Sequence, residues 1–359
     1  MQNKRKFNSL MVTGGCGFIG SNFIRFLIND SDFDGKIVNI DKLTYAGNPL
    51  SLKDIEQEFP ERYHFIRADI CDRKQMATIF ESHQVDAICH FAAESHVDRS
   101  IKSPDPFIQS NIMGTYTLLE IARTHADQLT LFHHISTDEV FGSLDNSGFF
   151  TETSPYQPNS PYSASKASSD HLIRAYGETY KLPVTLSNCS NNFGPYQFPE
   201  KLIPLMILNA LEDKPLPLYG DGKNVRDWLY VTDHCSAIWT VMCAGEIGET
   251  FIIGGDAEKQ NKEVVENICD ILDRLAPLNG KSYRSLITYV TDRPGHDHRY
   301  AIDCTKLKQT LKWHPKESFE SGIEKTVKWY MDNKEWIDQV KTGAYREWIQ
   351  KHYYSASGF

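Results

Sequence analysis

Several features that would assign this chain to other protein classes are missing from its 359 residues. It contains no run of 18 apolar residues, so we predict no transmembrane helix and no membrane partner. The first nine residues lack the apolar core of a signal peptide. No basic block stands out and the net charge is −9, which argues against a nucleic-acid partner. We therefore expect the protein to act in the cytoplasm.

The spacing of the eight cysteines matches neither a metal site nor a redox motif. There is no C-x-x-C pair and no Cys/His cluster with zinc-ligand spacing, so no resident metal is predicted. Reduced and mostly buried thiols are the expectation for such cysteines. The chain also lacks internal repeats and low-complexity tracts, while its 40% hydrophobic content is ample for a large core.

What the chain does have is a regular alternation of segment types up to about residue 190. Short apolar runs predict strands at residues 10–13, 36–40, 63–67, 86–91, 129–135 and 183–188. Apolar residues at helical spacing predict helices at residues 18–29, 49–59, 73–82, 104–126 and 161–180. Strands alternating with helices indicate an α/β fold built on a doubly wound parallel sheet of the Rossmann type.

A glycine-rich turn follows the first predicted strand. Gly14, Gly17 and Gly20 form a variant of the dinucleotide-binding fingerprint, in which glycines let the backbone approach a pyrophosphate at a helix N-terminus. Asp41 ends the second strand, about twenty residues further on, where a carboxylate can accept hydrogen bonds from the adenosine ribose. Because this carboxylate would repel a 2′-phosphate, the pattern favours NAD over NADP.

The texture of the sequence changes after residue 194, where five prolines interrupt residues 195–217. We predict an NAD-binding Rossmann domain over residues 1–194, to which a segment near residues 225–255 returns. A smaller, mixed α/β domain that binds the substrate is predicted over mainly residues 195–359.

An acid pair and a tyrosine–lysine pair supply the candidate chemistry. Asp138 and Glu139 sit where the fifth strand should end, at the edge of the sheet where ligands bind. Tyr162 and Lys166 are four residues apart and share one helix face. An ammonium group and a cationic nicotinamide would both favour the tyrosine phenolate, which suits hydride transfer from an alcohol. The two carboxyl groups indicate a second proton-transfer step.

Each of these short motifs often arises by chance, and their order along one chain is what makes them informative. The chain resembles the extended short-chain dehydrogenase/reductases and, within them, the dTDP-glucose 4,6-dehydratase family. The motifs that carry the resemblance are TGGCGFIG at 13–20, DKLTYAGN at 41–48, HFAAESHVDRS at 90–100, STDEVFG at 136–142, YSASK at 162–166, NCSNNFGPYQFPEKLIP at 188–204, YGDGKNVRDWLYV at 219–231 and DRPGH at 292–296.

The resemblance implies a role for each matching residue. The implied catalytic residues are Thr137, Asp138 as acid, Glu139 as base, Tyr162 and Lys166. The implied NAD contacts are Gly14, Gly17, Phe18, Ile19, Gly20, Asp41, Lys42, Leu43, Thr44, Asp69, Ile70, Phe91, Ala92, Ala93, Glu94, Ser95, Ser110, Tyr162, Lys166 and Asn192. The implied substrate contacts are Ser95, Thr137, Asn191, Lys201, Leu202, Pro217, Leu218, Tyr219, Arg226, Asn261, Asp292, Arg293, Pro294, Gly295 and His296.

The same resemblance implies oxidation of dTDP-glucose at C4, loss of water across C5 and C6, and return of the hydride to C6. Three other readings stay open at this stage. A nucleotide-sugar 4-epimerase or decarboxylase would use Tyr162 and Lys166 alone, and a CDP- or GDP-sugar dehydratase would differ in the base pocket. A catalytically inactive NAD-binding regulator would not need the five catalytic residues together. The helices at 104–126 and 161–180 resemble the pair that joins two subunits in relatives, so a homodimer is expected.

Overall fold

The computed structural model describes residues 4–292 and 296–341, and its largest element is a seven-stranded sheet in the order β10-β6-β5-β4-β1-β2-β3. Every neighbouring pair in this sheet runs parallel. The strands are β1 (Ser9–Thr13), β2 (Lys36–Asp41), β3 (Tyr63–Arg67), β4 (Ala87–His90), β5 (Leu131–Thr137), β6 (Val184–Cys189) and β10 (Thr250–Ile253). The predicted doubly wound sheet is confirmed.

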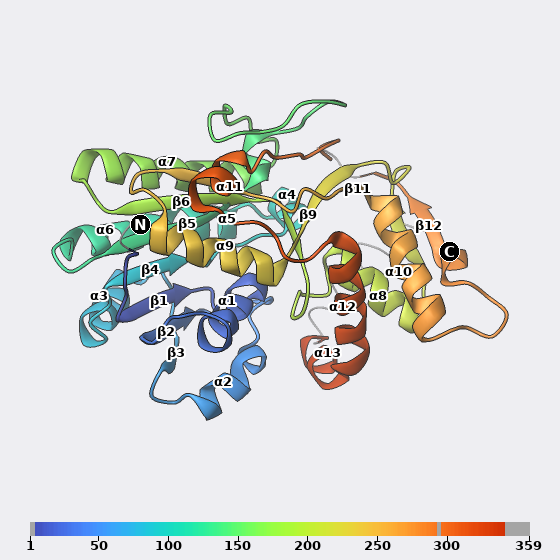
Figure 1. Cartoon of the computed structure of the whole chain (residues 1–359), viewed down its shortest axis with the longest axis horizontal. Helices are drawn as coiled ribbons and strands as arrows, with labels where there is room; N and C mark the ends of the chain where they lie inside the picture. The colour runs from blue at the N-terminus through green and yellow to red at the C-terminus, as the bar shows by residue number, and fades with distance from the viewer. Residues whose placement is uncertain (1–3, 293–295, 342–359) are drawn as a thin grey trace.

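Helices cover both faces of this sheet (Figure 1). They are α1 (Phe18–Asn29), η1 (Pro49–Leu52), α2 (Lys53–Glu58), α3 (Arg73–Ser82), α4 (Val97–Lys102), α5 (Asp105–Phe107), η2 (Ile108–Gly114), α6 (Thr115–Thr124), η3 (Asp138–Phe141), α7 (Pro161–Tyr180), α9 (Val231–Ala244) and α11 (Thr305–Leu311). The strands are apolar at successive positions because their side chains pack alternately into hydrophobic cores on the two faces of the sheet. Leu10 and Val12 pack with α1 and α9, whereas Met11 packs with α3, α6 and α7.

Two sequence predictions need correction here. The predicted helix at 104–126 is divided into α5, the π-helical η2 and α6. Within η2 the side chain of Asn111 bonds the backbone of residue 94 and the hydroxyl of Ser165. The fifth strand extends through Ser136 and Thr137, two residues beyond the predicted end. Strand β10 and helix α4 were not predicted as separate elements.

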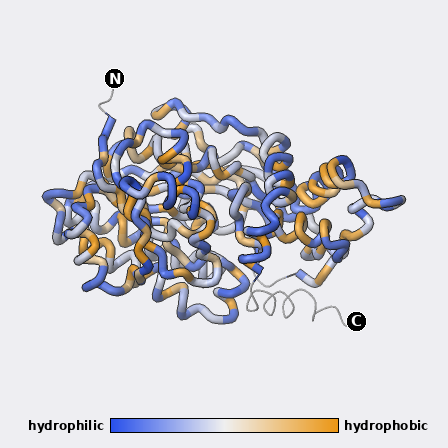
Figure 2. Tube along the Cα trace, turned by 90° about the horizontal axis from the view of Figure 1, so that it is seen from below, coloured by the Kyte–Doolittle hydropathy of each residue, from blue (hydrophilic) through white to orange (hydrophobic). Residues whose placement is uncertain are grey.

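The smaller part of the molecule has its own hydrophobic core, and it has its own mixed sheet, as predicted (Figure 1). Hydrophobic and hydrophilic residues alternate along its trace (Figure 2). In β11-β9-β7, β11 is antiparallel and β7 is parallel to β9, while β12 and β8 form a parallel pair. Its elements are β7 (Asn191–Phe193), α8 (Leu202–Leu211), β8 (Leu216–Tyr219), β9 (Val225–Tyr230), β11 (Glu258–Gln260), α10 (Asn261–Leu275), η4 (Tyr283–Leu286), β12 (Ile287–Val290), α12 (Phe319–Asp332) and α13 (Lys334–Val340).

All eight cysteines are free thiols, and seven of them are buried, as expected. Among the described helices, none combines the length and the hydropathy needed to cross a membrane.

Candidate active site

A cleft of about 310 Å³ lies at the carboxyl edge of the seven-stranded sheet. Its walls come from the β1–α1 turn, from the ends of β2 to β6, and from the segment that follows β6. In a doubly wound sheet this is the edge where ligands bind. The sequence predictions can therefore be compared with the side chains that line this one cleft.

The β1–α1 turn brings backbone, rather than side chains, to the cleft. Gly14 has φ +72°, and a Cβ there would lie 2.7 Å from the backbone of Ala92. Gly17 precedes α1 and offers no side-chain cap, so the first turn of the helix, including Phe18, borders the cleft uncapped. An uncapped helix N-terminus beside a cradle that a Cβ would fill suits the pyrophosphate of a dinucleotide.

Asp41 is held rigidly at the end of β2. Its carboxylate accepts hydrogen bonds from the backbone N–H of Cys16 at 2.9 Å and of Leu43 at 2.8 Å. Burial raises the pKa of Asp41, and these two backbone hydrogen bonds oppose the effect. The carboxylate lines the cleft with lone pairs still available, which suits the hydroxyl groups of a ribose.

The remaining predicted cofactor residues gather around the same cleft. Lys42 Nζ and Asp69 Oδ2 are 2.6 Å apart, and the side chain of Asn111 fixes the backbone of Glu94 by bonding its N–H at 2.9 Å and its C=O at 3.0 Å. Leu43 does not line the cleft. The predicted cofactor residues that line it are Gly14, Gly17, Phe18, Ile19, Gly20, Asp41, Lys42, Thr44, Asp69, Ile70, Phe91, Ala92, Ala93, Glu94, Ser95, Ser110, Tyr162, Lys166 and Asn192.

All five predicted catalytic side chains line the cleft together. Thr137 ends β5 and begins the short turn η3, which carries Asp138 and Glu139. The Thr137 hydroxyl oxygen accepts a hydrogen bond from the Glu139 N–H and donates one to Asp138 Oδ1, each at 3.3 Å. The threonine therefore orients both members of the acid pair.

The two acids of the pair differ in their surroundings. Asp138 is only 2% exposed, whereas Glu139 is half-buried. Burial raises the pKa of Asp138 well above its usual value, and the charges of Glu139 and Asp227 raise it further. The burial of Asp138 thus favours its protonated form, the form that a general acid requires.

Tyr162 and Lys166 lie in the first two turns of α7, whose N-terminus is fixed by a capping box between Ser160 and Ser163. Lys166 Nζ donates to the Ile135 carbonyl at 2.8 Å. Burial lowers the pKa of Lys166 to about 8. In the protein alone, burial and Glu139 raise the pKa of Tyr162, which differs from the phenolate expected from the sequence. A cationic nicotinamide in the cleft would act in the opposite direction.

The predicted substrate residues fall into two places. Ser95, Thr137, Asn191 and Lys201 line the cleft, and Lys201 Nζ donates to the Ser95 carbonyl at 2.9 Å. Outside it, the rings of Tyr219 and His296 are 6.0 Å apart, and His296 Nδ1 lies 2.6 Å from Asp292 Oδ1. Predicted residues that do not line the cleft are Leu202, Pro217, Leu218, Tyr219, Arg226, Asn261, Asp292 and His296. Arg293, Pro294 and Gly295 lie outside the described residues.

The guanidinium group of Arg226 is buried and has several fixed partners. It donates to the carbonyls of Val225 at 2.7 Å and Asp297 at 2.9 Å, and it lies 4.3 Å from the Tyr300 ring centre. Its charge is close enough to Asp138 to oppose the rise in that pKa. The guanidinium is therefore held in a fixed position near the acid pair.

Several cleft residues were missed by the sequence analysis: Ile40, Ala46, Gly47, Ala68, Ile135, Ser136, Cys189, Ser190, Gln197, Phe198 and Glu200. Most of them are sequence neighbours of predicted residues at the same strand ends. Their position at the end of a predicted strand could therefore have identified them as cleft residues. Glu200 is buried and pairs with Arg99 at 3.2 Å, a contact between distant segments that spacing cannot reveal. In the described part of the chain, no group of three His, Cys, Asp or Glu side chains could hold a metal.

Comparison with known proteins agrees with this geometry. A family profile described as GDP-mannose 4,6 dehydratase matches residues 11–326. The dTDP-glucose 4,6-dehydratase 1 of Escherichia coli strain K12 is 57% identical over 96% of this chain and 98% of its own length.

Two solved structures are similar over nearly the whole chain. The dTDP-glucose 4,6-dehydratase of Bacillus anthracis, solved in complex with NAD, is 48% identical with a TM-score of 0.84, over 93% of this chain and all of its own. The Streptomyces venezuelae enzyme of the same name, solved with NAD bound, is 44% identical with a TM-score of 0.85, over the same shares. With its cleft, its acid pair and its tyrosine–lysine pair, this chain belongs to the dTDP-glucose 4,6-dehydratase family of the extended short-chain dehydrogenase/reductases.

Proposed function

We propose that this chain is an NAD-dependent dTDP-glucose 4,6-dehydratase that forms dTDP-4-keto-6-deoxyglucose. The observation that carries the proposal is the pairing of a buried Asp138, whose pKa is raised by burial and by Glu139, with a more exposed Glu139, in one cleft with Tyr162 and Lys166. An epimerase of the same superfamily would need no such acid pair. Bound NAD would supply the acceptor for the C4 hydride and its return to C6, so the overall reaction leaves the coenzyme unchanged.

In the first step Tyr162 takes the proton of the sugar 4-hydroxyl. Its pKa is raised by burial and by Glu139, so the phenolate depends on nearby positive charge. Lys166, held by the Ile135 carbonyl, is placed to supply that charge and to contact the nicotinamide ribose. Thr137 is the proposed hydrogen-bond partner of the 4-hydroxyl, as the family resemblance implies. The position of these side chains in one cleft supports the proposed roles.

Elimination would follow because a 4-ketone makes the C5 hydrogen acidic. Glu139 is the proposed base that removes this proton. Asp138 is the proposed acid that donates to the departing 6-hydroxyl, since its burial and its charged neighbours keep it protonated. Adjacent carboxyl groups with different exposure thus supply an acid and a base at one pH.

For the coenzyme we propose the predicted set of contacts, with the uncapped start of α1 on the pyrophosphate and Asp41 on the adenosine ribose. For the substrate we propose that Lys201 and Arg226 face the diphosphate and that Tyr219, Asp292 and His296 form the far end of the site. Asn191, Leu202, Pro217, Leu218, Asn261 and residues 293–295 complete the proposed substrate set.

We also propose the division into an NAD-binding part, residues 1–194 with a returning segment near 225–255, and a sugar-nucleotide part over mainly 195–359. Helix α9, which packs on α1, and strand β10, which pairs with β6, support the returning segment. A homodimer is proposed from the resemblance and from exposed apolar side chains on η2 and α6. Free thiols throughout the chain support action in the cytoplasm.

The test is to incubate the purified protein with dTDP-glucose, without added reductant, and to follow the mass of the sugar nucleotide. We expect loss of one water from dTDP-glucose and not from UDP-, CDP- or GDP-linked sugars. Glu139→Gln should slow the reaction by about 100-fold or more, because a general base is removed. Unchanged mass with every donor would refute the proposal, and conversion to the galactose isomer would indicate an epimerase.

A further inference from the structure

A third ionisable side chain lies on the face of α7 that carries Tyr162 and Lys166. Asp170 lies one helical turn beyond Lys166, on the same face, and it has no exposed surface. A carboxylate in such a place must be compensated by hydrogen bonds or by an opposite charge. The contacts of Asp170 show how this is done.

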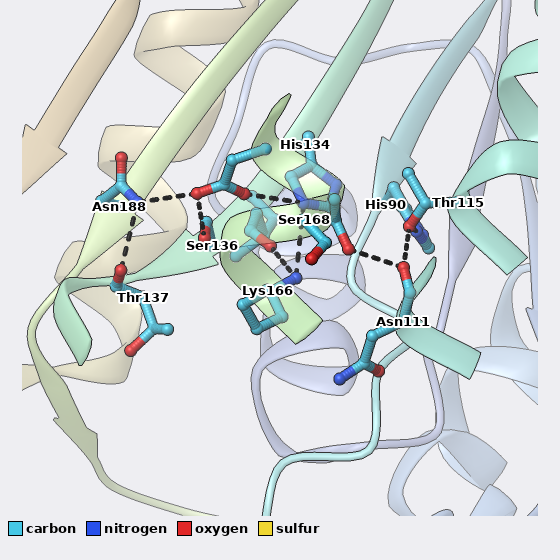
Figure 3. A network of polar contacts seen from close by, with 12 residues as sticks. His90, Asn111, Thr115, His134, Ser136, Thr137, Lys166, Ser168 and Asn188 are labelled. Atoms are coloured by element: carbon cyan, nitrogen blue, oxygen red, sulfur yellow. Dashed lines mark hydrogen bonds and ion pairs between the residues drawn. The ribbon is translucent and has the colours of Figure 1, made fainter. Parts of the chain in front are cut away.

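One oxygen of Asp170 collects donors from three other segments. Oδ2 accepts hydrogen bonds from Ser136 Oγ at 2.7 Å, from Tyr156 OH at 2.9 Å and from Asn188 Nδ2 at 3.3 Å. Asn188 also donates to the Thr137 carbonyl at 3.1 Å, so it bridges the carboxylate to the end of β5 (Figure 3). Asp170 therefore ties α7 to the strand ends from which the acid pair begins.

The other oxygen of Asp170 and the Lys166 ammonium both lie close to the imidazole of His134. Lys166 Nζ lies 3.4 Å from His134 Nε2, and the same Nε2 lies 3.3 Å from Asp170 Oδ1. Burial, followed by the charge of Lys166, lowers the pKa of His134 well below its usual value, so the imidazole is neutral. The Lys166 ammonium and the Asp170 carboxylate thus both approach the same nitrogen of a neutral ring.

Each of the two charges opposes the pKa shift that burial causes in the other residue. Burial raises the pKa of Asp170 to about 6, and Lys166 opposes the rise. Burial lowers the pKa of Lys166 to about 8, and Asp170 is the largest effect in the opposite direction. The other ionisable groups that act on these residues or face the same network are His90, His134, Asp138, Glu139, Tyr156, Tyr162, Arg174 and Cys189.

We propose that Asp170 is a positioning residue of the reaction, whose negative charge supports the Lys166 ammonium and whose hydrogen bonds tie the Tyr162–Lys166 helix to the Thr137–Glu139 turn. It touches neither coenzyme nor sugar, since it does not line the cleft. The inference rests on the proposed function, because the step it supports is proton removal by Tyr162.

Asp170→Asn tests the charge while keeping the size of the side chain. Enzyme loaded with NAD is mixed with dTDP-glucose, and the first burst of enzyme-bound NADH is followed from about pH 6 to about pH 9. Loss of the anion lowers the pKa of Lys166, so the loss of activity on the alkaline side should begin at lower pH, by about half a unit or more. The KM for dTDP-glucose should change by less than about twofold, because Asp170 does not contact the substrate.

Glu178→Gln is the matched control, since it removes an exposed carboxylate from the same helix. Its alkaline limb should coincide with that of the unchanged enzyme. A folded Asp170→Asn protein, with circular dichroism matching the original, whose burst is slower by one factor at every pH would overturn the inference in favour of a purely structural role. If the unchanged enzyme itself gives no burst and no water loss, the proposed function has failed instead.

Tyr156→Phe decides the matter if Asp170→Asn does not fold. It removes one hydrogen bond to Asp170 Oδ2 and leaves the carboxylate in place. Because that hydrogen bond lowers the pKa of Asp170, its loss raises the pKa above about 6, and the carboxylate is neutralised at higher pH. A larger fraction of the carboxyl group is then neutral at the pH where Lys166 titrates, so the Lys166 ammonium is less well supported. The alkaline limb of the burst should therefore begin at lower pH than in the unchanged enzyme, with a smaller shift than in Asp170→Asn. An alkaline limb that stays in place would refute the role of the charge.

Discussion

At the scale of single residues, the chemistry depends on burial more than on residue type. Asp138 and Glu139 are neighbours in sequence, yet one is 2% exposed and the other is half-buried. Lys166 and Asp170 would be ordinary surface charges on another helix. Here both are enclosed, and their pKa values move toward each other, to about 8 and about 6. The environment, rather than the side chain, assigns each residue its protonation state.

Asp138→Asn should separate function from stability. The folded protein keeps the Asp138 proton at pH values where the unfolded chain has lost it, so stability falls as pH rises above the unfolded pKa. An amide does not titrate and escapes this loss. We expect the variant to melt at a higher temperature than the unchanged protein near neutral pH, while kcat falls by about 100-fold or more.

Thermal unfolding followed by circular dichroism, beside the water-loss assay, measures both effects. Asp127→Asn, at an exposed position, is the control and should alter neither quantity. A lower melting temperature for Asp138→Asn would show that its carboxyl group stabilises the fold through its bond with Thr137.

At this scale the sequence predicts a site residue where the spacing within one helix or at one strand end is enough to define its position. The spacing of Tyr162 and Lys166 defines a helix face by itself, and the acid pair lies at a strand end. Asp170 lies on the same helix face, but its role depends on partners from β5, β6 and residue 156, which only the tertiary fold brings together. Spacing within a helix could not reveal it.

At the scale of elements, periodicity predicted some boundaries closely and missed others for physical reasons. Helices at 18–29, 73–82 and 161–180 begin and end where their apolar spacing begins and ends. The 104–126 segment has the same spacing, yet seven residues of it are π-helical. A Cβ at Gly114 would lie 2.4 Å from the Ile70 side chain, so packing against the neighbouring segment shapes this helix. The spacing of apolar residues within one segment carries no information about contacts with another segment.

The β1–α1 turn offers a test of the glycine motif. At Gly14 an added Cβ meets the backbone of Ala92 at 2.7 Å, and φ is +72°. Gly14→Ala should therefore displace the turn and weaken NAD binding by about tenfold or more. Fluorescence titration of coenzyme-free protein with NAD measures the loss.

Gly148→Ala is the appropriate comparison. Gly148 also has positive φ, at +88°, but no atom lies within 4 Å of the added Cβ. This variant should lose some stability and keep its affinity for NAD. Equal loss of affinity in both variants would mean that backbone strain, and not the close approach to Ala92, decides coenzyme binding.

At the scale of the whole molecule, the chain crosses between its two parts more than once. After β6 it enters the smaller part, and α9 and β10 return it to the seven-stranded sheet (Figure 1). The cleft lies along this crossing, so residues as distant as Gly14 and Lys201 line one cavity. The prolines at residues 195–217 indicate in the sequence where the smaller part begins. They could not show which strand of the sheet the chain would rejoin.

The surface of the α6–α7 layer supports the expected homodimer. Ile108, Met113, Tyr116 and Tyr180 are exposed apolar residues on η2, α6 and α7, with exposures between 37% and 48%. Apolar side chains clustered on neighbouring helices are better explained by a partner surface than by solvent. A second copy of the chain, joining these helices in an isologous contact, is the partner expected from the resemblance.

Met113→Glu combined with Tyr116→Glu places four new charges in a dimer interface, two from each copy, where unpaired carboxylates are costly to bury. We expect the original protein to sediment as a dimer and the double variant as a monomer that retains its fold. Tyr289→Glu, at a residue 55% exposed on β12, is the matched control and should remain dimeric. Because neither Met113 nor Tyr116 lines the cleft, the monomer should still bind NAD. A double variant that stays dimeric would place the contact on another face.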